Sequence, residues 1–461
     1  AISNNKIYVA SAYGFLVYNL LSGETNFYTK QETPLSLNSN PCNCVYVDER
    51  NNLWVGTDLG GVNIAFARSL KFPLSNFNYE LSFGNIYAFY HEPSKNKLWL
   101  GGVSVFHELD LLTGRSVSHA DFLGNGTVLS MARESEDVFW LGTWGSGIFR
   151  YDLRTRKIKN ILSSKLGGTI LSMTIANGNL YAGSAADGLF KIDLVTHAVT
   201  RFTEADGLPN SSINTIFTDS KNRVWLGTYD GGLVCMKGWD TEGRLRIEKV
   251  YTSKGKPSEL SSNVVFGINE DAAGHIWAAT SLGLSKLMND GSFYNFYEKN
   301  GLANTYLYSI LKDSVNNFWM SSNGGIINFD PRKPEKEIAF KNYGAKDGLL
   351  NTEYNMGSAF TASGGVLFFG GAKGFNMFRP AAVKNNLKPP AVYLTGYKRA
   401  GQDVAADTVI TYKRRLTLAS DENFFQIEVA ALDFTDPSRN KFKYKLEGYD
   451  RDWSAPSVVR Y

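Results

Sequence analysis

Cysteine is scarce in the sequence, and this scarcity argues against a disulfide-stabilised fold. The three cysteines among 461 residues are Cys42, Cys44 and Cys235, and an odd number cannot be fully paired. Their spacing matches no zinc motif, so we expect them to be small buried residues. Long apolar runs are also absent, because no stretch approaches the ~18 residues that a membrane-spanning helix requires.

A surplus of one charge is lacking as well. The 48 Lys+Arg and 44 Asp+Glu residues leave a net charge of +4, which is too small to indicate binding to nucleic acid or to an acidic membrane surface. Apolar residues make up 43% of the chain and charged residues 20%, and this balance excludes a disordered protein. At ~150 residues per domain, the length suggests two or three domains.

A short pattern recurs along most of the chain. It consists of an apolar residue, an aromatic residue, a second apolar residue, Gly or Ala, and Thr or Ser, as in Val224-Trp225-Leu226-Gly227-Thr228. Intervals between copies run from 41 residues (Trp99 to Trp140) to 52 residues (Trp225 to Trp277). Six of the nine tryptophans occupy the aromatic slot, so we treat the repeat as real. The slot residues are Tyr8, Trp54, Trp99, Trp140, Tyr181, Trp225, Trp277, Trp319 and Phe368.

Each repeat is predicted to form four short strands. In the unit around Trp225 these are Asn214 to Asp219, Val224 to Thr228, Leu233 to Met236, and Leu245 to Tyr251. Four antiparallel strands every ~40–50 residues are typical of a propeller blade. We expect the slot aromatics to fill the space between neighbouring blades, and the small residue after each to let the blades approach closely. The alternative is a row of platforms on which sugars stack.

The repeat resembles the two-component-regulator propeller repeat. In that repeat, an Asp, a short turn and a Leu-Trp-Ile-Gly-Thr-like strand precede Gly-Gly-Leu. Residues Asp219 through Leu233 match this order closely, and Asp48 through Val62 and Asp313 through Ile326 match nearly as well. The likeness covers residues 1 to about 380.

A second resemblance follows the repeats. After a stiff linker at Lys388-Pro389-Pro390, strands are predicted from Ala391 to Tyr397, Arg415 to Leu418 and Phe424 to Ala430. The sequence from Tyr444 to Trp453 then resembles the triple-tyrosine domain, an immunoglobulin-like β-sandwich.

The predicted fold class is therefore all-β. We expect residues 1–80 to be the last two blades of an upstream propeller, residues 81–385 a seven-bladed β-propeller, and residues 386–461 an incomplete immunoglobulin-like sandwich. A single nine-bladed ring is the alternative. Because members of the resembled family usually carry two seven-bladed propellers and a complete sandwich, we expect this chain to be part of a longer protein.

No catalytic constellation is evident in the sequence. The five histidines are scattered without metal-ligand spacing, and no phosphate-binding loop is present. Most carboxylates fall in predicted turns, such as Asp219 and Asp313, where such side chains bond their own backbone. We therefore expect no catalytic residue, metal or cofactor in this segment.

One face of the predicted propeller carries candidate ligand-binding residues. Trp144, Tyr229 and Asn323 lie in the turns after the second strands, and Glu353-Tyr354-Asn355 follows a loop that leads into a first strand. Aromatic rings, amides and a few charges suit a carbohydrate. The alternative is that the Asn residues only form turns and that Trp144 is a contact at the blade rim.

The resemblance implies a function. Its family consists of sensor regions of Bacteroides-type hybrid two-component systems, so this chain would be a periplasmic segment that binds an oligosaccharide and controls polysaccharide-utilisation genes. It would act as a homodimer, bind no nucleic acid itself, and meet the membrane only through a helix outside this chain. The kinase module would also lie outside it. Two alternatives remain, a propeller-fold polysaccharide lyase or glycosidase and a protein-docking scaffold.

Overall fold

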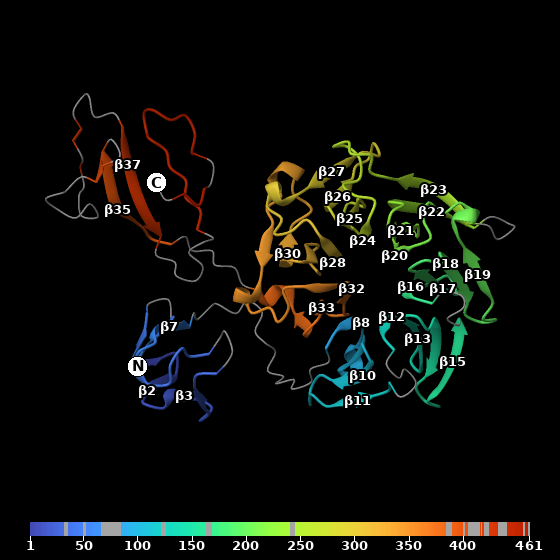
Figure 1. Ribbon diagram of the computed structural model, residues 1–461, viewed down its shortest axis with the longest axis horizontal. Helices are drawn as coiled ribbons and strands as arrows, with labels where there is room; N and C mark the ends of the chain where they lie inside the picture. Colours follow the sequence, from blue (N-terminus) through green and yellow to red (C-terminus); the bar gives the residue numbers. More distant parts are fainter. Residues whose placement is uncertain are drawn as a thin grey trace. The chain divides into compact units, whose positions relative to one another are not determined.

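The chain, seen in a computed structural model, divides into two compact units. The larger is Leu70–Val383, and the smaller combines Ala1–Ser69 with Lys384–Tyr461. Regular structure in the described residues is β-strand with three-residue 3-10 turns (Figure 1), so the all-β prediction is confirmed, and no helix there is long or apolar enough to cross a membrane. The structure describes residues 1–31, 36–48, 52–65, 84–120, 126–162, 168–239, 245–383, 390–399, 402–403, 415, 417–418, 424–431, 440–454 and 457–459.

The larger unit consists of antiparallel sheets whose strands follow chain order. Its described residues form six four-stranded sheets and one three-stranded sheet. The first three sheets are β8 (Ile86–Glu92), β9 (Lys97–Gly102), β10 (Val105–Asp110), β11 (Ser116–Ser118); β12 (Val128–Ser135), β13 (Val138–Thr143), β14 (Ile148–Asp152), β15 (Lys157–Leu162); and β16 (Ile170–Ala176), β17 (Asn179–Ser184), β18 (Leu189–Asp193), β19 (Val199–Phe202).

The remaining four sheets continue the same order. They are β20 (Ile213–Thr218), β21 (Val224–Thr228), β22 (Leu233–Trp239), β23 (Leu245–Tyr251); β24 (Val265–Glu270), β25 (Ile276–Thr280), β26 (Gly283–Leu287), β27 (Phe293–Phe296); β28 (Leu307–Lys312), β29 (Phe318–Ser322), β30 (Gly325–Phe329), β31 (Lys341–Tyr343); and β32 (Tyr354–Thr361), β33 (Leu367–Gly371), β34 (Gly374–Phe378). The 3-10 turns are η1 (Pro93–Lys95), η2 (Glu204–Asp206), η3 (Glu298–Asn300), η4 (Glu335–Glu337), η5 (Ala345–Asp347) and η6 (Pro380–Ala382). The four strands predicted around Trp225 agree with β20–β23.

These sheets follow one another around a closed ring (Figure 1). The first strand of each sheet contacts the first strand of the next, and β32 of the last sheet contacts β8 of the first. Side chains reinforce the closure, because Asn355 Nδ2 and Ser358 Oγ both donate to the Ile86 carbonyl at 2.8 Å. This arrangement is consistent with propeller blades.

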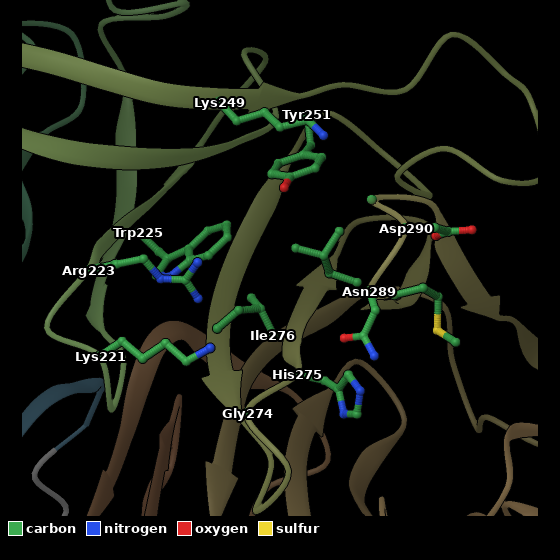
Figure 2. A pocket seen from close by; sticks show the side chains of 13 residues that line it. Lys221, Arg223, Trp225, Lys249, Tyr251, Gly274, His275, Ile276, Asn289 and Asp290 are labelled. Carbon is green, nitrogen blue, oxygen red and sulfur yellow. The ribbon is translucent and has the colours of Figure 1, made fainter.

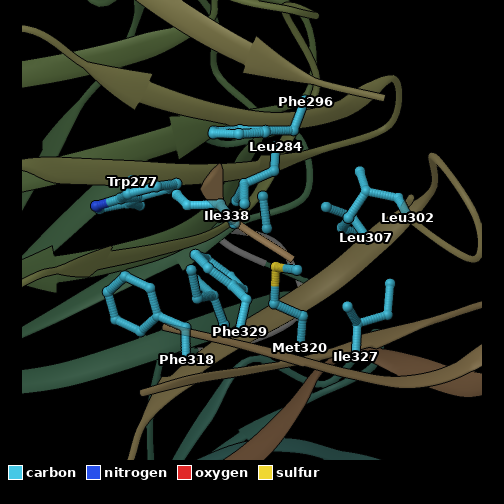
Figure 3. Close-up of a cluster of buried hydrophobic side chains, with 12 residues drawn as sticks. Trp277, Leu284, Phe296, Leu302, Leu307, Phe318, Met320, Ile327, Phe329 and Ile338 are labelled. Atoms are coloured by element: carbon cyan, nitrogen blue, oxygen red, sulfur yellow. The ribbon is translucent and has the colours of Figure 1, made fainter. Parts of the chain in front are cut away.

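Aromatic side chains pack between consecutive sheets. Trp277 of the β24–β27 sheet, fully buried, packs with Phe318 and Phe329 of the following sheet (Figure 3). Comparable clusters contain Trp99, Trp140, Tyr181, Trp225, Trp319 and Phe368, each exposed by 5% or less. Phe368 belongs to the last sheet and packs against Leu98 and Leu100 of the first. Because both faces of a strand such as β25 are covered, all five of its residues are buried.

Small residues beside the slot allow this packing. A Cβ at Gly227 would lie 2.8 Å from a methyl carbon of Val265 in the next sheet, closer than van der Waals contact permits. Gly232 in the following turn has a φ of +78°, which a side chain would strain. Both observations agree with the roles that the sequence predicts for the repeat glycines.

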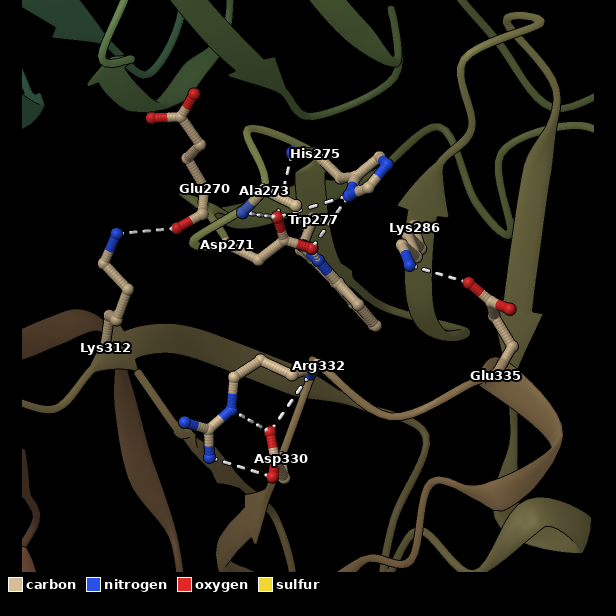
Figure 4. A network of polar contacts seen from close by, with 10 residues as sticks. All are labelled: Glu270, Asp271, Ala273, His275, Trp277, Lys286, Lys312, Asp330, Arg332 and Glu335. Carbon is tan, nitrogen blue, oxygen red and sulfur yellow. Dashed lines mark hydrogen bonds and ion pairs between the residues drawn. The ribbon is translucent and has the colours of Figure 1, made fainter. Parts of the chain in front are cut away.

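A carboxylate six residues before the slot anchors the tryptophan in several of the sheets. Asp271 Oδ1 accepts from the backbone N–H of Ala273 and His275, while Oδ2 accepts from Trp277 Nε1 at 3.0 Å (Figure 4). The sequence analysis expected the backbone bonds but not the bond to the indole. The same bond over six residues joins Asp48 to Trp54, Glu134 to Trp140, Asp219 to Trp225, and Asp313 to Trp319.

These bonds also hold the Asp271 carboxylate charged. Burial alone would raise the pKa of Asp271, but the donors from Trp277 and His275 outweigh it, so the pKa lies below its ordinary value. The first sheet differs, because Pro93 stands six residues before Trp99. The Trp99 indole N–H has no partner among the described residues.

The smaller unit contains three sheets in its described residues. The N-terminal part holds β1 (Ile2–Ser3), β2 (Lys6–Ser11), β3 (Gly14–Asn19) and β4 (Thr25–Tyr28), then β5 (Cys42–Val47), β6 (Leu53–Thr57) and β7 (Gly61–Ala65). Phe15, Cys42 and Val55 are buried together, and the slot residues Tyr8 and Trp54 are partly buried. Cys235 is also buried, whereas Cys44 is exposed, contrary to expectation.

The C-terminal part forms a sheet of β36 (Gln402–Asp403), β35 (Val392–Arg399) and β37 (Phe425–Ala431) in that order. The prediction of a strand from Arg415 to Leu418 is wrong for its described residues 415, 417 and 418. β35 pairs with β37 along most of its length and with β36 at Lys398 and Arg399. Residues 388 and 389 of the predicted linker lie outside the described residues.

We predict that Trp225→Ala lowers the free energy of unfolding of the larger unit by about 3–5 kcal/mol, because it removes a large buried ring between two sheets. Urea unfolding followed by circular dichroism measures the loss. The matched control is Trp144→Ala, since that indole is 64% exposed and its removal should change stability by less than about 0.5 kcal/mol. Equal losses in the two variants would contradict a packing role for Trp225.

Candidate functional site

Each first strand of the larger unit has an irregularity in its pairing with the second strand. In β28 the pairing shifts between Leu307 and Ser309, and in β24 it shifts between Val265 and Gly267. The extra residues at these shifts are Tyr308 and Phe266. Bulges commonly re-aim side chains in this way. Corresponding shifts in other first strands fall at Tyr87, Leu129, Leu171 and Asn214.

Three aromatic rings meet where two of these bulges are adjacent. The ring centroids of Phe266 and Tyr306 are 5.2 Å apart, those of Tyr306 and Tyr308 are 5.2 Å apart, and those of Phe266 and Tyr308 are 6.0 Å apart. Phe266 is buried, whereas both tyrosines are partly exposed. We call these three residues the aromatic cluster.

Polar side chains from the neighbouring loops surround the aromatic cluster. Tyr308 Oη donates to Asn323 Oδ1 at 2.7 Å. Burial raises the pKa of Tyr306, and the nearby Tyr229 phenol raises it further. Burial likewise raises the pKa of Tyr308, and the nearby Tyr306 phenol and Glu353 carboxylate raise it further. Both phenols therefore remain protonated at neutral pH and can donate hydrogen bonds.

The predicted ligand-binding residues divide into three groups. Tyr229, Asn323 and Glu353 are exposed and lie at the aromatic cluster. Trp144 is exposed in the turn between β13 and β14, on a sheet that contributes nothing to the cluster. Tyr354 is 4% exposed and donates to Asn376 Oδ1, and Asn355 bonds the Ile86 carbonyl. Those two side chains are engaged in packing the last sheet against its neighbours.

The loops leading into the first strands use their polar residues internally. Asp206 and Asn300 each accept from a backbone N–H three residues earlier, and Asn304 Oδ1 accepts from the Tyr306 N–H at 2.7 Å. These residues are turn formers. The sequence analysis missed Phe266, Tyr306 and Tyr308, although the Tyr306-Leu307-Tyr308 alternation directly after such a loop was a usable signal.

Two pockets lie at the ends of the strands that are opposite to the aromatic cluster. One, of about 270 Å³, is lined by the β20–β21 and β24–β25 turns, and the other, of about 440 Å³, by Lys286 and residues 331–335. Neither includes a predicted ligand-binding residue. The described residues contain no group of three or more His, Cys, Asp or Glu side chains that could hold a metal ion.

Comparisons with known proteins bear on this fold. Residues 36–58 and 207–230 match the model of the two component regulator propeller family. Histidine kinase P4 of Formosa agariphila is 25% identical over 377 residues, which cover 78% of this chain and 24% of that protein. The chain therefore spans about a quarter of that curated relative.

Two solved structures share the architecture. Both are extracellular domains of putative hybrid two-component systems from B. thetaiotaomicron. The first is 22% identical with a TM-score of 0.73, covering 98% of this chain and 61% of that one. The second is 20% identical with a TM-score of 0.53, covering 100% of this chain and 63% of that one. This chain thus carries two-component-regulator propeller repeats, and its fold is that of extracellular domains of putative hybrid two-component systems.

Proposed function

We propose that this chain is the periplasmic ligand-sensing segment of a hybrid two-component system, and that it binds an oligosaccharide at the aromatic cluster. In this proposal residues 81–385 form a seven-bladed propeller, residues 1–80 contribute two blades of another propeller, and residues 386–461 belong to an immunoglobulin-like sandwich. The segment itself is not catalytic. The signal passes through a membrane helix to a kinase outside this chain and controls polysaccharide-utilisation genes.

The aromatic cluster is the observation that carries the proposal. Ring faces can pack against the apolar C–H surface of a sugar, and the surrounding groups can bond its hydroxyls. The phenols donate, the Glu353 carboxylate accepts, and the Asn323 amide can do both. Because these groups come from consecutive sheets of a rigid ring, they are positioned before a ligand arrives, which lowers the entropic cost of binding.

We predict that an oligosaccharide from a screen of plant and algal glycans raises the melting temperature of the chain. A ligand at 100 times its Kd stabilises by about 2.7 kcal/mol. Tyr229→Ala should weaken binding about tenfold without changing the melting temperature of the unliganded protein, because Tyr229 is 58% exposed. Tyr449→Ala, which removes a tyrosine 83% exposed in the smaller unit, is the matched control.

The same screen separates the proposal from its alternatives. Release of new reducing ends during incubation would favour a lyase or glycosidase. If no glycan raises the melting temperature, a protein-docking scaffold becomes the better account. A glycan whose affinity is unchanged in Tyr229→Ala would contradict the aromatic cluster as its site.

For signalling we propose a homodimer with two arrangements, of which the oligosaccharide favours one. A ligand signals only if it binds the two arrangements with different affinity. We predict that small-angle scattering of the dimer changes when ligand is added to saturation. Superimposable scattering curves with and without ligand would rule out this relay.

A further inference from the structure

The pocket of about 270 Å³ lies between the β20–β23 and β24–β27 sheets. It is lined by the β20–β21 turn, the β24–β25 turn and residues 287–291 (Figure 2). The β20–β21 turn is at one end of β21, and Tyr229 is in the turn at the other end. This pocket is therefore separate from the aromatic cluster, and the proposed function makes no use of it.

One wall of the pocket is aromatic. Trp225 and Tyr251 stack with their ring centroids 6.2 Å apart and their planes inclined by 22°. Ile276 and Leu287 of the neighbouring sheet contribute apolar surface. Trp225 and Ile276 are buried, so the partly exposed Tyr251 and Leu287 are the surfaces that a small ligand could contact.

Hydrogen-bond donors around the pocket are largely unused. Arg223 bonds Asp219 through Nε at 2.7 Å, which leaves its two Nη groups without partners among the described residues. Lys221 Nζ has no partner in that part of the chain either. Lys249 Nζ lies 4.8 Å from the centroid of the Tyr251 ring and meets no carboxylate there. Figure 2 shows these three side chains around the same opening.

The carboxylate acceptors near the pocket are mostly occupied, and Asp290 Oδ2 is the exception among the described residues of the lining. Asp219 Oδ2 accepts from Trp225 Nε1 as well as from Arg223. Asp290 Oδ1 accepts from the backbone N–H and the Oγ of Ser292. Burial and the neighbouring Glu248 raise the pKa of Cys235 to about 12, so the thiol stays protonated and donates to Glu248 Oε2 at 3.4 Å. The pocket thus brings together Lys221, Arg223 and Lys249 against one exposed carboxylate, Asp290, of which one oxygen is free among the described residues.

We propose that this pocket binds the oxyanion of a small acidic ligand, namely a carboxylate or a sulfate. The Arg223 Nη groups present parallel N–H donors that match the two oxygens of such a group. Asp219 partly cancels the positive charge of Arg223, to which it is bonded. Lys221 and Lys249 supply further positive charge. A sugar acid and a free inorganic anion share this chemistry, and both are included in the test.

Isothermal titration calorimetry of the 461-residue chain tests the proposal with three probes: glucuronate, its uncharged counterpart glucose, and inorganic sulfate. We expect glucuronate, sulfate or both to bind at least tenfold more tightly than glucose. The double variant Lys221→Gln/Lys249→Gln should lose at least tenfold in affinity for the anion. Lys157→Gln, which removes an exposed charge from β15 of another sheet, should leave that affinity unchanged.

The outcomes are distinct. Binding of glucuronate alone identifies a sugar acid as the source, and binding of sulfate with the same lysine dependence identifies a free anion. The proposal fails if neither anion binds more tightly than glucose. It also fails if the double variant binds the anion as tightly as the unmodified chain does. Tyr229→Ala serves as a further control, because anion binding that it abolishes would belong to the aromatic cluster.

Discussion

The packing of an aromatic ring between consecutive sheets is the interaction on which the larger unit depends, and in four of its seven sheets a carboxylate bonds the indole of that ring. A single residue such as Asp271 closes the turn before a second strand through its backbone bonds and fixes the indole of Trp277 through its other oxygen. Local turn geometry and inter-sheet packing are thereby coupled at one carboxylate. The ring that it orients then fills the space against Phe318 of the next sheet. In the other three sheets Trp99, Tyr181 and Phe368 pack between the sheets without a carboxylate six residues earlier.

Because the aromatic residues occupy the space between sheets, the two ends of the ring are left for other tasks. The strand bulges direct Phe266 and Tyr308 toward one end, where Asn323 and Glu353 add polar groups. At the other end, the pocket of about 270 Å³ lies between two sheets and is lined in part by cationic side chains. The scaffold thus keeps a buried aromatic ring between consecutive sheets while its loops vary.

Much of this architecture could be predicted from the sequence, because the repeat is carried by local chemistry. The buried Trp225 and the Gly227 beside it follow directly from the spacing of the motif. The aromatic cluster was harder to predict, since a bulge shifts the pairing by one residue and the Tyr306-Leu307-Tyr308 alternation is the one trace that it leaves near the cluster. The place of Tyr354 was missed for the same reason. It was predicted as a ligand-binding residue after a loop, but it lies in the core as the first residue of β32.

A double-mutant cycle between Asp271 and Trp277 tests the central claim most directly. Asp271→Ala removes the acceptor, and Trp277→Phe removes the indole donor while keeping a ring. Hydrogen bonds to charged groups contribute about 1.5–3 kcal/mol, so we predict a coupling energy of that size in urea unfolding. The pair Asp271→Ala and Trp99→Phe should show no coupling, because the Trp99 N–H has no partner in the described residues. Additive losses for Asp271 and Trp277, within about 0.5 kcal/mol, would contradict the account.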